Sequence, residues 1–175
     1  RQNYDESSFY KFDKNTVIKN FDTSKIDLKI QQTSNDKYLK SEKLKNNITN
    51  ESDILENSFN LDLYSNDLSI NVGTTVYENL NKEDNDRYEF ILPRVLLTKN
   101  FGNIGNFDGN LSLTSDSSIR QYDTNVFEKQ NINNFNFNSD RKINNLGILN
   151  NHQFLLRNTN SDNENSNYKN KQSAY

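Results

Sequence analysis

Hydrophobic and polar residues alternate almost one for one along residues 55–80 of the chain. Because successive residues of a β-strand point to opposite faces of a sheet, a period of two predicts strands with one apolar and one polar face. The alternation is interrupted by Ser65, Asn66 and Asp67, whose short side chains readily bond the nearby backbone in turns. The segment is therefore predicted to be a β-hairpin of two strands, at residues 55–63 and 68–76.

The predicted hairpin sorts its side chains into two sets. The apolar face carries Phe59, Leu61, Leu63, Leu68, Ile70, Val72 and Val76. The polar face carries Glu56, Ser58, Asn60, Asp62, Ser69, Asn71 and Thr75. In a soluble sandwich the apolar face packs on a second sheet and the polar face meets bulk water. In a membrane barrel the apolar face meets lipid and the polar face lines a hydrated lumen. Parity alone does not separate the two.

Similar alternation recurs along most of the chain. It predicts strands near residues 9–12, 25–31, 87–99, 107–113, 126–138 and 146–156, and the beginning of another at 168–175. Weaker patterns indicate a short strand at Val17 and Ile18 and a short helix over residues 37–45. The fold class predicted is all-β, an antiparallel up-and-down meander of about eight strands.

One strand changes parity in its middle. Tyr88, Phe90 and Leu92 share one face, whereas Val95 and Leu97 have the opposite parity. A β-bulge at Pro93, between the two halves, would restore a single apolar face. Proline is tolerated at bulges because its missing N–H is not needed in the ladder.

The predicted links alternate between long and short, which favours a barrel over a sandwich. Outer-membrane barrels have long external loops and short periplasmic turns, and strands of about 9–11 residues suffice to cross a bilayer. The longer links are predicted at 34–53, 79–87, 114–125 and 158–167, and the shorter ones at 65–67, 99–106 and 138–145. Aromatic residues near strand ends would suit an interfacial girdle, namely Tyr64, Tyr77, Tyr88, Phe101, Phe107, Tyr122, Phe127 and Phe137.

Composition narrows the alternatives. Only 31% of the 175 residues are hydrophobic, and 34 are Asn against one Ala. Such a chain has few large residues with which to fill an enclosed core, and it raises disorder as an alternative; the regular alternation and the 20 Phe and Tyr residues oppose disorder. The net charge of −3 is spread evenly, without the basic stripe expected of a nucleic-acid-binding protein. The chain has no initiator Met and no recognisable signal peptide, so we expect an excerpt of a longer protein.

No residue pattern points to catalysis, a metal or a cofactor. The chain has no Cys, and its one histidine, His152, has no second ligand type with which to form a zinc set. Acidic clusters at 84–86 and 162–164 lack the spacing of a calcium loop. Glu56 and Asp62 share a face, but six strand residues separate them by about 20 Å, too far for a glycosidase pair. The sequence therefore predicts a protein that is not an enzyme.

Three segments resemble the LptD family of outer-membrane lipopolysaccharide-assembly proteins: SNDKYL at residues 34–39, the hairpin at 55–76, and YEFILP at 88–93. None is diagnostic by itself, and their order and spacing carry the resemblance, which is strongest across residues 26–138. It implies that residues 1–175 are part of a very large barrel in the outer membrane of a Gram-negative bacterium. The family's periplasmic jelly-roll domain has no counterpart in the chain.

The resemblance also implies function and partners. Lipopolysaccharide would arrive from the periplasmic Lpt bridge, its sugars would cross the polar lumen, and a plug lipoprotein would contact the barrel. The hairpin would then be wall, with its apolar set facing lipid and its polar set facing the lumen. Two alternatives stay open: another porin-like or adhesin barrel, and a soluble β-sandwich that binds carbohydrate or serves as a surface module.

Overall fold

The computed structural model of the chain describes residues 6–37, 53–105, 107–122, 126–165 and 168–174. Its strands are β1 (Ser7–Thr16), β2 (Thr23–Thr33), β3 (Ile54–Ser65), β4 (Leu68–Asn79), β5 (Tyr88–Ile104), β6 (Phe107–Tyr122), β7 (Val126–Ser139), β8 (Lys142–Ile143), β9 (Leu149–Asn150), β10 (Gln153–Asn165) and β11 (Tyr168–Ala174). A single 3-10 turn, η1 (Asp84–Arg87), precedes β5. The predicted helix at 37–45, and Tyr38 and Leu39 of the SNDKYL segment, lie outside the described residues apart from Lys37.

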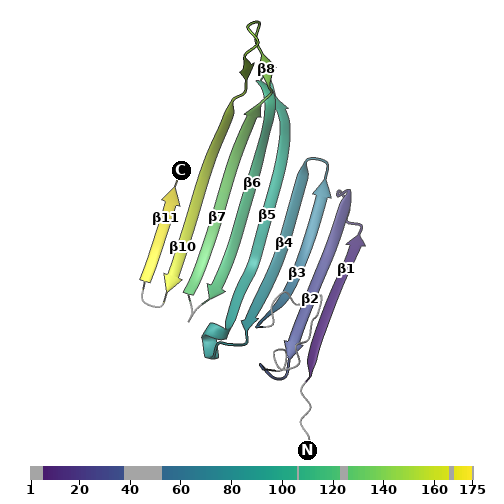
Figure 1. Cartoon of the computed structure of the whole chain (residues 1–175), viewed down its shortest axis with the longest axis vertical. Helices are drawn as coiled ribbons and strands as arrows, with labels where there is room; N and C mark the ends of the chain where they lie inside the picture. Colours follow the sequence, from purple (N-terminus) through teal and green to yellow (C-terminus); the bar gives the residue numbers. More distant parts are fainter. Residues whose placement is uncertain (1–5, 38–52, 106, 123–125, 166–167, 175) are drawn as a thin grey trace, which may run out of the picture.

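Nine of these strands form one antiparallel sheet in the order β1-β2-β3-β4-β5-β6-β7-β10-β11. Each strand pairs with the next in the sheet, and β8 and β9 form a small hairpin that projects from the end of β7 and β10 (Figure 1). The prediction of an all-β, antiparallel up-and-down meander is confirmed, with one strand more than expected. In the described part of the chain the sheet is open, with β1 and β11 at its edges.

Several strands are longer than the roughly 9–11 residues that suffice to cross a bilayer, and several predicted links are wrong. β5 has 17 residues and β6 has 16. Residues 114–122 and 158–165, which were predicted to be links, belong to β6 and β10. These segments are polar on both faces, so their side chains do not alternate. The backbone ladder nevertheless holds them as strands, through the β6–β7 and β7–β10 registers.

The remaining links also depart from the predicted alternation. β6 and β7 are separated only by residues 123–125, and β10 and β11 only by residues 166–167. At the opposite end, β7 and β10 are joined by a longer excursion that contains the β8–β9 hairpin. The strand predicted to begin at Leu146 begins instead at Gln153, and Leu146 is 84% exposed in the hairpin turn. Val17, predicted to lie in a short strand, is in the β1–β2 link.

The predicted bulge at Pro93 is confirmed. Gly73 pairs with Arg94 and Thr75 pairs with Ile91, so β5 holds one residue more than β4 over this interval. The β5–β6 register shifts at the same place, between Ile91 and Arg94. As a result, Phe90 and Val95 lie on the same face of the sheet although their sequence parity differs.

The sheet is a single layer with almost no enclosed core. Leu55 and Leu80 are the only buried hydrophobic residues in the described part, and Phe9 packs against them. Many large apolar side chains of the sheet are exposed, among them Phe59, Phe135 and Phe154. The apolar face is therefore present as predicted, but no second layer of the described residues covers it.

Deleting Pro93 should abolish the single apolar face. Without the bulge residue, the half of β5 before it slips by one position, and Tyr88, Phe90 and Leu92 turn to the polar face. We expect loss of the folded sheet, measured as protease resistance and a cooperative thermal transition. Deleting the exposed Leu146 is the matched control, because it alters only the projecting β8–β9 turn. A stably folded Pro93 deletion would contradict the role of the bulge.

Candidate functional site

The two predicted sets of hairpin residues lie on opposite faces of the sheet. Paired residues of an antiparallel ladder share a face, and Phe59, Leu61 and Leu63 are paired with Thr74, Val72 and Ile70. The predicted polar residues pair with one another in the same way, for example Ser58 with Thr75 and Asp62 with Asn71. Asn71 Nδ2 donates to Asp62 Oδ1 over 2.6 Å. What each face touches, lipid or lumen, stays a prediction.

The apolar stretch follows the rows of paired residues within β3–β5 and again within β6–β10, but it is displaced between these two groups of strands. The row that starts at the centre of the β3 stretch contains Leu61, Val72, Val95, Ser117, Asn131 and Asn160. It is apolar as far as β5 and polar from β6 onward. On β10, apolar side chains of this face resume at Leu156 and Phe154, four and six residues nearer the β8–β9 hairpin than Asn160. The centre of the apolar stretch is thus displaced by about five residues between β3 and β10. The displacement falls at the β5–β6 ladder, where Val95 pairs with Ser117, and averages one residue per strand over the five ladders.

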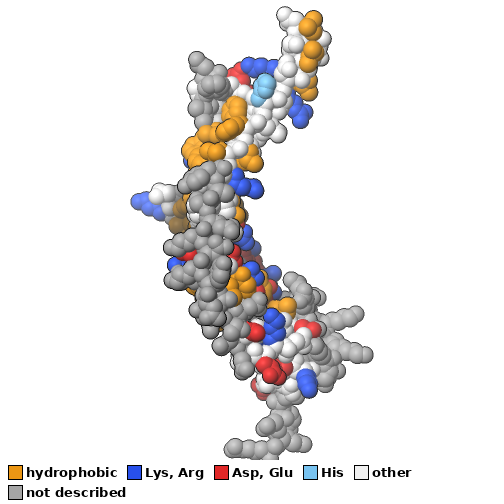
Figure 2. All heavy atoms as spheres, turned by 90° about the vertical axis from the view of Figure 1, so that its left-hand side faces the viewer, with side chains coloured by type: hydrophobic (Ala, Val, Ile, Leu, Met, Phe, Trp, Pro, Cys, Tyr) orange, Lys and Arg blue, Asp and Glu red, His pale blue; other side chains and the backbone are white. Residues whose placement is uncertain are grey.

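The upper parts of the C-terminal strands carry this displaced stretch. Leu113 pairs with Phe135, which pairs with Leu156, and Leu111 is likewise linked through Phe137 to Phe154. In the edge-on view of Figure 2, hydrophobic side chains gather on one flank of the upper half of the sheet. We call the apolar side chains of this face together the apolar band. Its members include Phe59, Leu61 and Leu63 on β3, Leu68, Ile70, Val72 and Val76 on β4, Val95 on β5, and Leu111, Leu113, Phe135, Phe137, Phe154 and Leu156 on β6, β7 and β10.

Below the apolar band, the same face of β6, β7 and β10 is mostly polar, with Ile119 and Phe127 as apolar exceptions. Asn131 Nδ2 donates to Ser117 Oγ over 2.6 Å, and the amide of Asn133 donates to Asn131. On β10, Asn160 Nδ2 donates to Asn158 Oδ1 over 2.6 Å. These side chains bond to one another, and amides and hydroxyls are groups that water solvates readily. This part of the face suits an aqueous surface.

The polar face carries charges of both signs, joined in pairs. Lys29 Nζ lies 2.6 Å from Glu56 Oε2, Arg120 Nε donates to Glu89 Oε1 over 2.7 Å, and Arg94 Nη2 lies 2.8 Å from Asp116 Oδ2. Solvent-accessible pairs of this kind contribute little to stability, about 0–1 kcal/mol each. Their main effect is to leave the face hydrophilic without a strong net charge.

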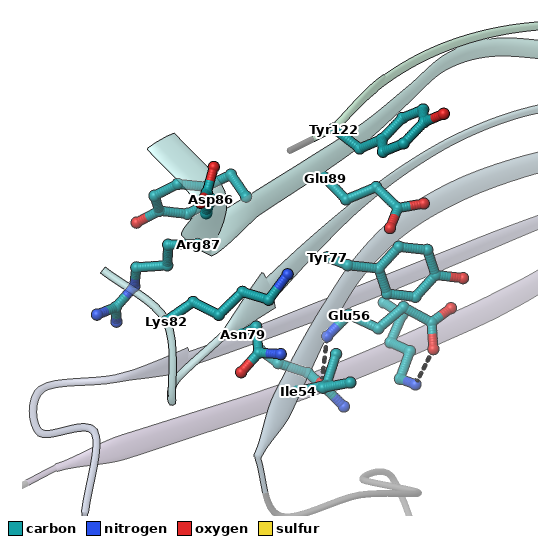
Figure 3. A pocket seen from close by; sticks show the side chains of 12 residues that line it. Ile54, Glu56, Tyr77, Asn79, Lys82, Asp86, Arg87, Glu89 and Tyr122 are labelled. Carbon is teal, nitrogen blue, oxygen red and sulfur yellow. Dashed lines mark hydrogen bonds and ion pairs between the residues drawn. The ribbon is translucent and has the colours of Figure 1, made fainter. Parts of the chain in front are cut away.

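A pocket of about 410 Å³ lies on the polar face near the β4–β5 link. At its centre, Glu56, Tyr77 and Glu89 are opposite one another on three neighbouring strands. Lys29 extends this row beyond Glu56 through its ion pair. Figure 3 shows Glu56, Tyr77, Glu89 and Tyr122 extending to the same side, whereas Arg87 extends away from them. The row presents aromatic rings between paired charges.

The buried side chain of Gln31 helps to hold this row in place. The regular β2–β3 pairing ends at Lys29 and Ser58. Beyond it, the N–H of Gln31 donates to Asn57 Oδ1 and the N–H of Glu56 donates to Gln31 Oε1, each over 2.7 Å. Gln31 is only 3% exposed. These side-chain bonds continue the strand pairing and fix the position of Glu56.

Tyr77 and Tyr122 were assigned by the sequence to an interfacial girdle, and the register contradicts this for both. Tyr77 pairs with Glu56, and Tyr122 follows Arg120 by two residues on the same face. Tyr64, paired with Ser69, also lies on the polar face. The sequence held the signal, because Tyr77 has the same parity as Ser69, Asn71 and Thr75. Parity, and not aromatic character, therefore determines the face on which these tyrosines lie.

Arg87 ties the β4–β5 link to the turn after β2. Its guanidinium donates two hydrogen bonds to Asp36, of 2.8 and 2.6 Å, and one of 2.8 Å to Glu78. The bonds from Arg87 lower the pKa of the Asp36 carboxyl below its usual 3.8. The pKa of Arg87 itself is raised, first by Asp36 and then by Glu78. The pair was not predicted, because 51 residues separate its members.

Several other candidates from the sequence remain without a site. In the described part of the chain, no group of three acidic, His or Cys side chains is placed to hold a metal. The acidic segment at 84–86 forms the η1 turn, and the 162–164 segment is part of β10. A search of the described residues for a helix able to cross a membrane found none.

Comparisons with protein-family models, with curated proteins and with solved structures found no match. The resemblance to the LptD family therefore stays a prediction.

Acid should release the Asp36–Arg87 contact. Because the folded-state pKa of Asp36 is lowered, its contribution is complete above about pH 4 and is lost as the pH falls through that lowered pKa. The side chain of Asp36 is 45% exposed, so the effect should be small, about 0.5 kcal/mol. In the wild type, the amide-exchange protection of residues 33–37 should be kept between pH 5 and about pH 4 and should fall as the pH drops further, through the lowered pKa of Asp36. In Asp36→Asn it should already be low at pH 5; identical profiles would contradict the contact.

Proposed function

We propose that the chain is a wall segment of a large outer-membrane β-barrel that transfers lipopolysaccharide to the outer leaflet. The observation that carries the proposal is the diagonal course of the apolar band. Averaged over the five ladders from β3 to β10, the displacement is one residue, about 3.3 Å, for each strand spacing of about 4.8 Å, which corresponds to strands tilted by roughly 35° from the normal of the band. Strands of transmembrane barrels are tilted by about 35–45°.

The height of the band supports the same proposal. On β4 it extends from Leu68 to Val76, which is about 26 Å along the strand and about 20 Å after the tilt. The lipid-facing band of outer-membrane barrels is about 25 Å tall. The polar segments of β6, β7 and β10 that continue beyond the band would then stand in water or among lipid headgroups.

A barrel wall also fits a sheet that has no second layer. Its apolar face would be covered by lipid, and its paired charges and amides would line a hydrated lumen. Nine strands are too few for a channel that passes a lipopolysaccharide, since aqueous channels appear at about 16–18 strands. We therefore propose that further strands pair with β1 and β11.

We propose lipopolysaccharide as the substrate, and the periplasmic bridge and the plug lipoprotein as partners, because residues 34–39, 55–76 and 88–93 resemble the LptD family. The lumen-facing surface favours passage of sugars, because amides, hydroxyls and paired charges are well solvated and exchange hydrogen bonds readily. A soluble carbohydrate-binding sandwich is the alternative, and it requires a second sheet over the apolar band.

Single cysteines test the band directly, because the 175 residues contain none. In isolated membranes, cysteines at Leu61 and Leu113 should react with a charged, water-soluble maleimide more than about tenfold more slowly than cysteines at Asn60 and Ser117. Ser117 is the matched partner of Leu113, four residues away on the same face and strand.

Unfolding in denaturant provides the control, and it should equalise the four rates. A chain absent from the membrane fraction, or rapid labelling at Leu61 and Leu113 in folded protein, would refute the lipid-facing assignment.

The lumen assignment has its own test. Asn71→Leu replaces a polar side chain that donates to Asp62 on the proposed lumen face. We expect less lipopolysaccharide at the cell surface, measured by surface labelling, at an unchanged level of assembled barrel. Val72→Leu, the next residue on the opposite face, is the control and should leave the surface level unchanged. Normal surface lipopolysaccharide in a correctly assembled Asn71→Leu barrel would count against the lumen assignment.

A further inference from the structure

We infer that the pocket around Tyr77 and Tyr122 is a binding site for neutral pyranose units of a saccharide. The inference deepens the proposed function, on which it rests in taking the polar face as the path of the sugars. The pocket has a volume of about 410 Å³, which lies in the range of small-ligand sites, roughly 300–1,000 Å³.

The rings supply the first part of the recognition. Tyr77 and Tyr122 are half-buried, and both extend into the same open space in Figure 3. Arg120 lies over the Tyr122 ring, with its guanidinium carbon 4.2 Å from the ring centroid, which restricts that ring's orientation. A pyranose ring has an apolar C–H face, and a held aromatic ring gives that face a surface on which to stack.

The charges supply the second part. The pocket is lined by three basic residues, Lys29, Lys82 and Arg87, and by three acidic ones, Glu56, Asp86 and Glu89. The carboxylates of Glu56 and Glu89 are each bonded to a cation, yet each retains lone pairs that accept from hydroxyl groups. A balanced set of this kind gives no net attraction to a phosphate or a polyanion. It favours a neutral ligand rich in hydroxyls.

The arrangement along the row supplies the third part. Tyr77 is flanked by Glu56 on β3 and by Glu89 on β5, so hydrogen-bond acceptors lie on both sides of one ring. Tyr122 on β6 repeats the aromatic element one strand beyond Glu89 (Figure 3). A ring-stacking position edged by acceptors and followed by a second ring matches a short run of sugar units.

Binding to the purified full chain in detergent tests the inference, with titration calorimetry as the readout. The probes are maltohexaose and the neutral outer saccharide released from lipopolysaccharide. Tyr77→Ala and Tyr122→Ala should each weaken binding at least about fivefold, because truncating a central Tyr removes its contact surface. Tyr77→Phe keeps the ring and should retain most of the binding. Tyr64→Ala is the matched control. Tyr64 lies on β3, on the same polar face of the sheet but outside the pocket, so this variant should bind as the wild type does.

The outcomes show which saccharide is the ligand, and they distinguish a failure of the binding site from a failure of the proposed barrel function. Tyr-dependent binding of either probe supports the site; if only the lipopolysaccharide saccharide binds, the conducted substrate is the ligand. Absence of binding, equal loss in Tyr64→Ala, or competition by inorganic phosphate at constant ionic strength would overturn the inference. Cysteine labelling at Leu61 and Leu113 reports independently on the barrel, so Tyr-dependent binding with rapid labelling there would keep the site and remove the membrane function.

Discussion

The angle between the hydrogen-bonded rows and the apolar band is the constraint on which this structure depends. A single-layer sheet cannot bury its apolar face on itself, so the face needs one continuous covering medium. If the apolar stretch ran along the rows, the strands would stand perpendicular to its edges. Because it is displaced by about five residues between β3 and β10, an average of one residue per strand, these two strands present apolar side chains at different registers but along one band. A flat medium of fixed thickness can cover such a band only if the strands are tilted.

The same constraint explains why the strands are long and partly polar on both faces. β6, β7 and β10 pair along nearly their whole length, whereas the apolar residues that these three strands share in common rows occupy the end near the β8–β9 hairpin. Backbone ladders, with the Asn and Ser bonds between side chains, hold the remainder. In such a sheet the hydrophobic residues determine which face is covered, and the ladder determines where the strands end.

Alternation predicted the elements in which one face is apolar and failed where both faces are polar. The β3–β4 hairpin, its turn and the Pro93 bulge follow from parity alone and are confirmed. Residues 114–122 and 158–165 carry no alternation, so they were predicted to be links although they are strands. The pocket was missed for a different reason. Its row joins β2 to β6, and no local pattern specifies which residues become neighbours across separate strands.

The orientation of the strands in a bilayer tests the central claim most directly. Polarised infrared spectroscopy of the amide bands, on the full-length protein in oriented membranes, measures the average strand tilt from the membrane normal. The diagonal band predicts a tilt of roughly 35–45°. Strands lying in the membrane plane, or a protein that remains in solution without associating with the bilayer, would contradict the claim that lipid covers the apolar band.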